Sequence, residues 1–356
     1  MKNKNALIGT ATAMICIAIA CVLAVVMIAK PANDTNVADN SKDMVADVSF
    51  ESTFVSDDLS SDSGITSADS SSSSESEEPE VPELVLPLDT VIYSKIAVVY
   101  DVAEDAVIFQ RDAEIQSAPA SLTKLVTALV ALDHLSPTRR LTVGDEINMI
   151  GENSSVAFLG VGQKYTVKNL IDALLIPSGN DAAYVLAVNA ARVAANDMGL
   201  SMESAVSDFV RLMNEKAKSL GCFNTHFSTP DGYDAEGQVT TAMDMLKISV
   251  AAANNTHIKE SVAKDKSGGW VNSNLLVRED SVLYNECVTG LKTGSTSGAG
   301  YCVSVSAIVD EKTYIMVFMN SQTSDGRFKD ANTIINLLGK GDSDTTSEEI
   351  SVEPIA

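Results

Sequence analysis

The chain has 356 residues and a formal net charge of −23 at pH 7. So acidic a chain lacks the basic face that contact with phosphate backbones requires, and we therefore exclude a nucleic-acid partner. Its three histidines, His134, His226 and His257, have no ligand-like spacing and no Cys/His cluster beside them. We accordingly expect no metal, no cofactor and no metal-dependent peptidase.

The first segment of the chain predicts a membrane anchor. Lys2 and Lys4 lie in a short polar N-terminus, residues 1–5, and an apolar run follows over residues 6–29. The run reaches the roughly 20 residues that cross a bilayer, and it exceeds the roughly 7–15 of a cleavable signal. The leading lysines favour a cytoplasmic N-terminus and a single-pass protein with the rest of the chain outside. We favour an uncleaved anchor over cleavage or lipid attachment at Cys21, because the apolar run continues well past that cysteine.

Two further segments have the composition of disordered chain. Residues 30–86 are rich in Ser, Asp and Glu and carry fourteen acidic residues, and residues 341–356 carry five acidic residues and no basic one. Such segments have too little apolar surface to offset the entropy of ordering. We therefore predict an extended linker, a disordered tail, and one folded domain over residues 87–340.

The folded part is predicted to mix strands and helices. Strand character extends over residues 95–102 and 106–110. Helices are predicted at 122–135, 168–175, 181–195 and 202–220, the last with a C-cap at Gly221. Three more strands are predicted at 288–293, 301–309 and 313–319. Strands at both ends with helices between predict an α+β fold, in which the first and last segments complete one antiparallel sheet of about five strands.

Three short motifs follow one another along this domain: Ser121-Leu-Thr-Lys124, Ser178-Gly-Asn180 and Lys292-Thr-Gly294. Each motif is weak alone, and Ser261-Val-Ala-Lys264 and Lys266-Ser-Gly268 repeat two of the patterns in a polar stretch with no obvious helix or strand. The first set is in order and each member lies on or beside a predicted element. Together they indicate an acylable serine with a lysine as its base.

The setting of each motif suggests its chemistry. Ser121 is expected to open a helix with Lys124 one turn along, where the helix dipole lowers the pKa of the lysine and the Ser121 amide can stabilise an oxyanion. Ser178-Gly-Asn180 is expected in a break between helices, where the hydroxyl can relay a proton and the amide can hold a substrate backbone. Lys292-Thr-Gly294 is expected on a strand that faces an anionic substrate end, with Gly294 leaving room for a ligand backbone. Singly, a serine N-cap, a helix stop and a surface lysine are simpler explanations.

With these motifs in this order, the chain resembles the serine-type D-alanyl-D-alanine carboxypeptidases, the low-molecular-mass penicillin-binding proteins of peptidase family S11. The resemblance covers about residues 91–338. Further matching segments are Ala118–Lys124, Leu175–Ala183, Leu220–Phe227, Asp231-Gly232, Thr241-Ala242 with Asp244, Asn272–Leu276, Gly290–Gly294 and Ala299–Tyr301. The resemblance implies a β-lactamase/transpeptidase-like fold and attack on the bond between two D-alanines of a peptidoglycan stem peptide. It also implies that β-lactams inhibit by forming a long-lived acyl-enzyme, and that the protein belongs to a bacterial cell membrane.

The resemblance further implies the roles of individual residues. Ser121 is the nucleophile, Lys124 its base, and Ser178 takes part in proton transfer. The substrate-binding residues implied are Asn180, Lys292, Thr293, Gly294, Ser295 and Arg327. Among them Lys292 also serves proton transfer, the amides of Ser121 and Ser295 form the oxyanion hole, and Arg327 lies near the terminal carboxylate of the substrate.

Departures from the family pattern leave specific points open. Met243 stands where members often have an arginine, which leaves the ion pairing of Asp244 open. The turn 233–238 differs from the usual form, which leaves substrate preference open. Many members carry a β-rich second domain and a C-terminal amphipathic helix; we expect neither here, with residues 6–29 as the anchor instead.

Three alternatives remain at this point. A D,D-endopeptidase shares the whole motif set. A serine β-lactamase of class A needs a glutamate to activate water, and Glu215 lies in roughly the right interval but within an amphipathic helix. An inert wall-binding or antibiotic-sensing module is the third. Cys222, Cys287 and Cys302 permit at most one disulfide, and we expect buried thiols.

Overall fold

The computed structural model describes residues 83–86 and 90–340. The predicted anchor at residues 6–29 and the tail at 341–356 lie outside these residues, as does nearly all of the predicted linker. Within the described residues, no helix has the length and apolar character needed to span a membrane.

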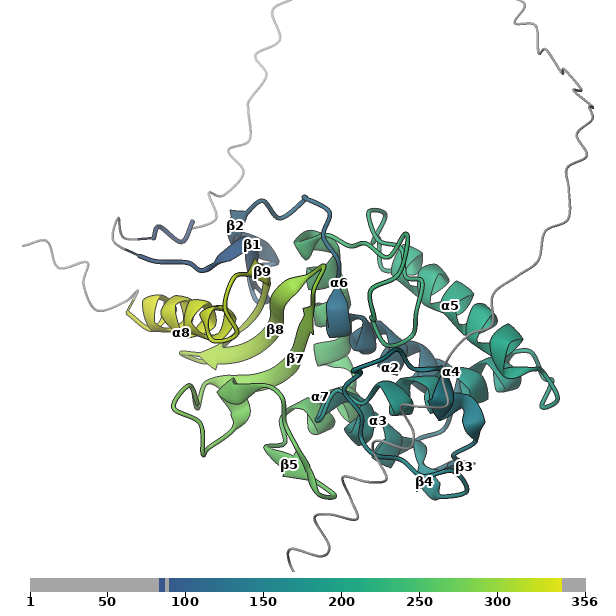
Figure 1. Ribbon diagram of the computed structural model, residues 1–356. Coiled ribbons are helices and arrows are strands. Elements are labelled where there is room, and N and C mark those ends of the chain that lie inside the picture. Colours follow the sequence, from purple (N-terminus) through teal and green to yellow (C-terminus); the bar gives the residue numbers. More distant parts are fainter. Residues whose placement is uncertain (1–82, 87–89, 341–356) are drawn as a thin grey trace, which may run out of the picture. The chain divides into compact units, whose positions relative to one another are not determined.

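A five-stranded antiparallel sheet lies at the centre of the described part, with the strand order β2-β1-β9-β8-β7 (Figure 1). The strands are β1 Ser94–Asp101, β2 Ala106–Arg111, β7 Val288–Thr296, β8 Gly300–Val309 and β9 Lys312–Ser321. β1 pairs with β9, with Val98 opposite Val317. The predicted closure of one sheet by the first and last segments is therefore confirmed.

Helices cover both faces of this sheet, and each face has its own apolar core (Figure 1). Alternate residues of β1 point to opposite sides: Ile96 and Val98 pack in the larger core, and Ala97 and Val99 in the smaller one. The larger core includes residues of α2 Lys124–His134, α3 Val167–Leu175, α4 Asn180–Ala194, α5 Met202–Ser219, α6 Ala242–Asn254 and α7 Thr256–Val262. The smaller core is completed by α8 Gly326–Leu338.

The short elements are two pairs of strands and three 3-10 turns. β3 Arg140–Thr142 pairs with β4 Lys164–Thr166, and β5 Lys266–Ser267 pairs with β6 Trp270–Val271. The 3-10 turns are η1 Ala120–Thr123, η2 Asp145–Met149 and η3 Leu275–Val277. The candidate site forms beside one of these short elements, η1, together with the loops that adjoin α3 and α6.

The helix boundaries follow local capping. Thr166 and Ser201 accept hydrogen bonds from the third residues of α3 and α5 through their side chains. Gly221, with φ of +75°, follows the end of α5, and the Cys222 amide bonds back to Ala217 at 2.9 Å. The predicted helix at 202–220 with its glycine cap is therefore confirmed.

The helix predicted over 122–135 is present, but it begins as the 3-10 turn η1 and α2 starts only at Lys124. One prediction about local structure was wrong. The stretch with the repeated motifs is not devoid of structure, because Ser261 lies in α7 and is 1% exposed. Val262 beside it packs under Gly290, where a Cβ would lie 2.5 Å from a Val262 methyl carbon.

Candidate active site

The serine and lysine of the first motif are in contact. Ser121 lies in η1, and Lys124 Nζ lies 2.8 Å from its hydroxyl oxygen. The preceding residue, Ala120, has φ of +47° and is fully buried. A non-glycine residue in this region is strained, and such strain is concentrated at functional sites.

Lys124 is held in a fully buried position by a second contact. Its Nζ donates to the backbone carbonyl of Asp231 at 2.6 Å, across a sequence separation of 107 residues. Burial lowers the pKa of Lys124 to about 8, against the charges of Asp231 and Asp181, which raise it. The direction of this shift is as predicted, but its main cause is burial and not the helix dipole. A lysine of this kind can accept a proton from a neighbouring hydroxyl near neutral pH.

The second motif lies in the predicted break between two helices. α3 ends at Leu175 and α4 begins at Asn180. Ser178 has φ of +66° and is 6% exposed. Asn180 donates from its side chain to the Ser154 hydroxyl at 2.9 Å. The break therefore presents polar groups beside a loop, residues 151–159, that the sequence did not indicate.

Asp181, directly after this motif, fixes that loop. Its carboxylate accepts the backbone amides of Ala157 at 2.9 Å and Leu159 at 3.0 Å. It also accepts its neighbour's amide, that of Ala182, at 2.9 Å. Three amide donors stabilise a buried carboxylate, so the loop that carries Ser154 is held to the start of α4.

The third motif lies on β7, as predicted, but its lysine is not on the surface. Lys292 is fully buried, and its Nζ donates to the carbonyl of Thr293 at 3.0 Å. Burial lowers its pKa well below the ordinary value, and the charges of Lys124 and Arg327 lower it further. The surface explanation of this lysine is therefore excluded.

Gly294 serves a different purpose from the one predicted. A Cβ at this position would lie 3.0 Å from the Ala120 Cβ and 3.1 Å from the Ser121 amide nitrogen. The space beside Gly294 is therefore occupied by η1 and is not open to a ligand backbone. The absence of a side chain lets β7 and η1 approach each other, which places Ser121 beside Ser295.

Arg327 reaches this strand from the first turn of α8. Its Nη1 donates to the carbonyls of Gly294 at 2.6 Å and Cys302 at 2.9 Å. The guanidinium stacks on Tyr301 and Phe328, and burial lowers its pKa to about 10. Neither Lys292 nor Arg327 forms an ion pair within residues 90–340. Two buried basic side chains without a carboxylate partner favour an anionic group in their neighbourhood.

A cleft with a volume of about 320 Å³ is lined by residues of η1, the loop at 151–155, the start of α4, the loop at 229–238 and the end of β7. Ser121, Asn180 and Ser295 line it, which unites members of the three motif regions. The other predicted site residues do not line it: Lys124, Ser178, Lys292, Thr293, Gly294 and Arg327. The lining residues that no sequence pattern indicated are Glu152, Asn153, Ser154, Ser155, Thr296 and Ser297, and the cleft is completed by Gly232, Tyr233 and Asp234. Polar loop residues of this kind carry no pattern of their own, although the unusual turn at 233–238 was noted.

The tip of that turn is tied to the other walls of the cleft. The Tyr233 hydroxyl donates to the carbonyl of Glu152 at 3.3 Å. The Asp234 carboxylate accepts the Ser297 hydroxyl at 3.1 Å and the Gly298 amide at 3.0 Å. Residues 229–238 therefore join the loop at 151–155 to the turn between β7 and β8.

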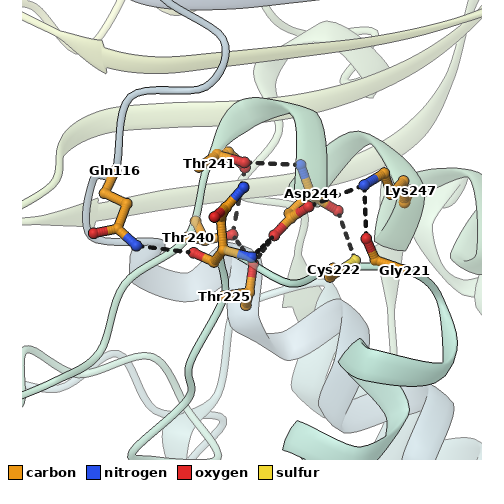
Figure 2. Close-up of polar contacts among 9 residues, drawn as sticks. Gln116, Gly221, Cys222, Thr225, Thr240, Thr241, Asp244 and Lys247 are labelled. Carbon is orange, nitrogen blue, oxygen red and sulfur yellow. Dashed lines mark hydrogen bonds and ion pairs between the residues drawn. The ribbon is translucent and has the colours of Figure 1, made fainter. Parts of the chain in front are cut away.

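The base of the same loop is anchored by a polar cluster around Asp244 (Figure 2). The Asp244 carboxylate accepts the Thr225 hydroxyl at 2.8 Å and pairs with Lys247 at 3.1 Å. Lys247 also donates to the carbonyl of Gly221 at 2.7 Å. The ion pair left open by Met243 is therefore made by a lysine one turn farther along α6.

Gly232 offers a test of this arrangement. Its φ is +82°, and a Cβ there would lie 2.0 Å from the carbonyl oxygen of Ala120. Gly232→Ala is expected to displace η1 and to lower the free energy of unfolding by about 2 kcal/mol or more, through backbone strain plus overlap. Urea unfolding measures this change.

Gly237→Ala is the matched control for that variant. Gly237 lies on the same loop with a similar φ of +76°, but the nearest atoms to its Cβ position are 3.8 Å away. The free energy of unfolding of this variant is expected to fall by less, because only the backbone strain contributes. Equal losses in the two variants would contradict the close approach of Gly232 to η1.

Comparison with known proteins agrees with this geometry. The D-alanyl-D-alanine carboxypeptidase family, peptidase S11, matches residues 85–323. The chain belongs to this family. The carboxypeptidase DacC of Escherichia coli K12 is 33% identical over 249 residues, which cover 67% of this chain and 59% of DacC. DacD of Salmonella typhimurium is 33% identical over 231 residues, covering 62% of this chain and 56% of DacD.

A solved structure shows the same fold. The crystal structure of the Streptomyces K15 DD-transpeptidase aligns with a TM-score of 0.63 and 28% identity, covering 70% of this chain and 98% of that one. This S11 chain thus spans less than two thirds of DacC and DacD but nearly all of the Streptomyces K15 structure. The predicted α+β, transpeptidase-like fold is confirmed for the described part.

Two remaining expectations for this S11 chain concern residues away from the cleft. Glu215 lies on α5, where its side chain is 56% exposed and pairs with Arg211 at 2.6 Å. Its carboxylate is exposed on α5 and paired with Arg211, and within the described part of the chain no contact joins it to Ser121 or Lys124, so it is not placed to activate water in the cleft. Cys222, Cys287 and Cys302 are free thiols, and Cys222 and Cys302 are buried as expected, whereas Cys287 is only half-buried.

Proposed function

We propose that this chain is a serine-type D-alanyl-D-alanine carboxypeptidase that removes the terminal D-alanine from peptidoglycan stem peptides. The observation that carries the proposal is the 2.8 Å contact between the Ser121 hydroxyl and the buried Lys124 amine at the cleft. Lys124 takes the proton of Ser121, whose oxygen attacks the carbonyl carbon of the penultimate D-alanine. The amides of Ser121 and Ser295 receive the developing oxyanion.

The second half of the proposed reaction releases D-alanine. Ser178 and Lys292 supply the proton to the leaving nitrogen, and Asn180 orients the peptide backbone. Water then hydrolyses the ester at Ser121. The buried basic side chains of Lys292 and Arg327, together with Thr293, support recognition of a free terminal carboxylate, which distinguishes a carboxypeptidase substrate.

The test is the release of free D-alanine from diacetyl-L-Lys-D-Ala-D-Ala by the full chain. We expect one D-alanine to be released for each peptide cleaved, with the remaining peptide freed by hydrolysis of its ester to Ser121. We also expect benzylpenicillin to form a stable adduct on Ser121. Since the similar Streptomyces K15 protein is a DD-transpeptidase, glycylglycine is added in a parallel reaction. Transfer of the acyl group to glycylglycine would show that an amine, and not water, is the acceptor. Cleavage of a cross-linked muropeptide alone would favour the endopeptidase. Rapid loss of benzylpenicillin without an adduct would favour the β-lactamase. Absence of every reaction in folded protein would favour the inert module.

We also propose that residues 6–29 anchor this protein in a bacterial cell membrane with the catalytic domain outside. The proposal is supported by the length of the apolar run and by Lys2 and Lys4 before it. The acidic residues at 30–86 suit a solvated spacer between anchor and domain. Carbonate extraction of membranes tests it, since an anchored protein stays in the pellet.

A further inference from the structure

The Asp231 side chain is a buried charge that the proposed mechanism does not yet use. Asp231 is fully buried, and its Oδ1 accepts the Tyr233 amide at 3.0 Å. Its Oδ2 has no hydrogen-bond partner within the described part of the chain. An unpaired buried carboxylate oxygen is costly, so a compensating charge nearby is required.

Lys124 is the basic residue that the structure connects to Asp231. The backbone carbonyl of Asp231 accepts Lys124 Nζ at 2.6 Å, which brings the same residue's side chain into the lysine's neighbourhood. Thr127, one turn along α2 from Lys124, donates to the carbonyl of Pro230 at 2.5 Å. Both contacts hold residues 230–231 against the first turns of α2.

The other charged groups around Lys124 come from three elements. Asp181 on α4 raises the pKa of Lys124 less than Asp231 does, and its oxygens already accept three amides. Lys292 on β7 interacts with Lys124 as a like charge, and Arg327 on α8 acts on Lys292 in the same sense. Tyr184 on α4 has a raised pKa, through burial and then through the charge of Asp231. Asp231 is therefore the acidic neighbour whose charge is least engaged elsewhere.

We propose that the Asp231 carboxylate is a positioning residue that stabilises the ammonium form of Lys124 when Ser121 gives up its proton. In that step the Ser121 O–H bond breaks, its proton forms an N–H bond at Lys124 Nζ, and the Ser121 oxygen bonds to the substrate carbonyl carbon. A new positive charge then appears in a buried site that already contains Lys292 and Arg327. Asp231 supplies the opposite charge without contacting the substrate. The inference rests on the proposed function.

The first test measures the pH profile of benzylpenicillin acylation in the full chain. The second-order rate is expected to rise with pH through a midpoint near 8 in the native protein, the pKa of Lys124. Asp231→Asn keeps the shape and the backbone carbonyl but removes the charge. We expect the midpoint to move down by about one pH unit, the low end for loss of a neighbouring opposite charge, and the plateau to fall because the base is weaker.

Glu236→Gln is the matched control for this profile. Glu236 is an exposed acid on the same loop and does not line the cleft, so its replacement should change neither midpoint nor plateau. Asp231→Glu, which keeps a carboxylate, should hold the midpoint closer to 8 than the asparagine variant. A lower plateau with an unmoved midpoint in Asp231→Asn would assign a merely structural role and overturn the proposal.

The second test measures the interaction between Asp231 and Lys124 through thermal stability, without any reaction. At pH 7, Asp231→Asn is combined with Lys124→Met, and the Tm of the native protein, both single variants and the double variant is measured. Loss of Lys124 leaves the buried Asp231 uncompensated, so adding Asp231→Asn should raise Tm in that background and lower it in the native one. Equal changes in both backgrounds, or failure of both asparagine variants to fold, would overturn the proposal. Absence of native acylation would instead contradict the proposed function, and the Tm comparison would still decide the role of Asp231.

Discussion

Replacing Ser121 with alanine is expected to abolish acylation by benzylpenicillin while the protein stays folded. The hydroxyl of Ser121 is the group in contact with the buried amine of Lys124, and alanine has no nucleophile to replace it. The variant loses one hydrogen bond at a half-buried position, so the free energy of unfolding should change by about 1 kcal/mol. Intact-mass spectrometry after brief incubation shows the missing adduct, and circular dichroism shows the retained fold.

Ser261→Ala is the control for that experiment, because Ser261 begins the second Ser-x-x-Lys pattern. Its hydroxyl is buried in α7 and has no hydrogen-bond partner among residues 90–340. Removing an unpaired buried hydroxyl is neutral or slightly stabilising. The variant should therefore carry the adduct at the native rate. If the adduct persisted in Ser121→Ala, or disappeared in Ser261→Ala, Ser121 would not be the nucleophile.

The five strands of the sheet and the helices α2 to α5 could be predicted because their patterns are local, whereas α8, with 13 residues, was not predicted. β8 and β9 are almost continuous apolar strands around the turn at Asp310-Glu311, and α5 has a serine cap, an apolar face and a terminal glycine. The pairs β3–β4 and β5–β6 have strands of three and two residues, which are too short for a period-2 pattern to show. The seven residues of α7 are similarly few. α6 was missed although Thr241 caps it with a bond to Asp244.

The candidate site could be predicted only where its side chains form a recognisable sequence motif. Ser121, Lys124, Asn180 and Lys292 stood out through motif spacing, and the fold brings their segments to one cleft. The support of Lys124 by the carbonyl of Asp231 could not be predicted, because every residue has a carbonyl. The packing of Gly294 against Ser121 was misjudged for a related reason: a glycine indicates a close approach but not what approaches it.

Lys124→Met is expected to reduce the rate of acylation by a factor of roughly 10² to 10⁴, the usual contribution of a positioned general base. Methionine fills a similar volume without an amine. Lys216→Met is the matched control, since Lys216 pairs with Asp133 on the surface at 3.0 Å and is remote from the cleft lining. That variant should be acylated at the native rate.

The pH dependence of the native rate explains why burial of Lys124 matters. The pKa lies below its ordinary value of 10.5, at about 8, so the amine loses its proton on raising the pH through 8. At pH 7 roughly a tenth of the molecules then hold a neutral base, against roughly one in three thousand for an unshifted lysine. The rate should therefore rise with pH between 6 and 9, and Lys124→Met should lose both the rate and this rise. A pH-independent native rate, or a Lys124→Met variant that keeps the rise, would show that another group takes the proton. Burying a lysine is unfavourable for the stability of the fold. In return, the fraction of molecules with a neutral Lys124 at pH 7 is several hundred times larger than for an unshifted lysine.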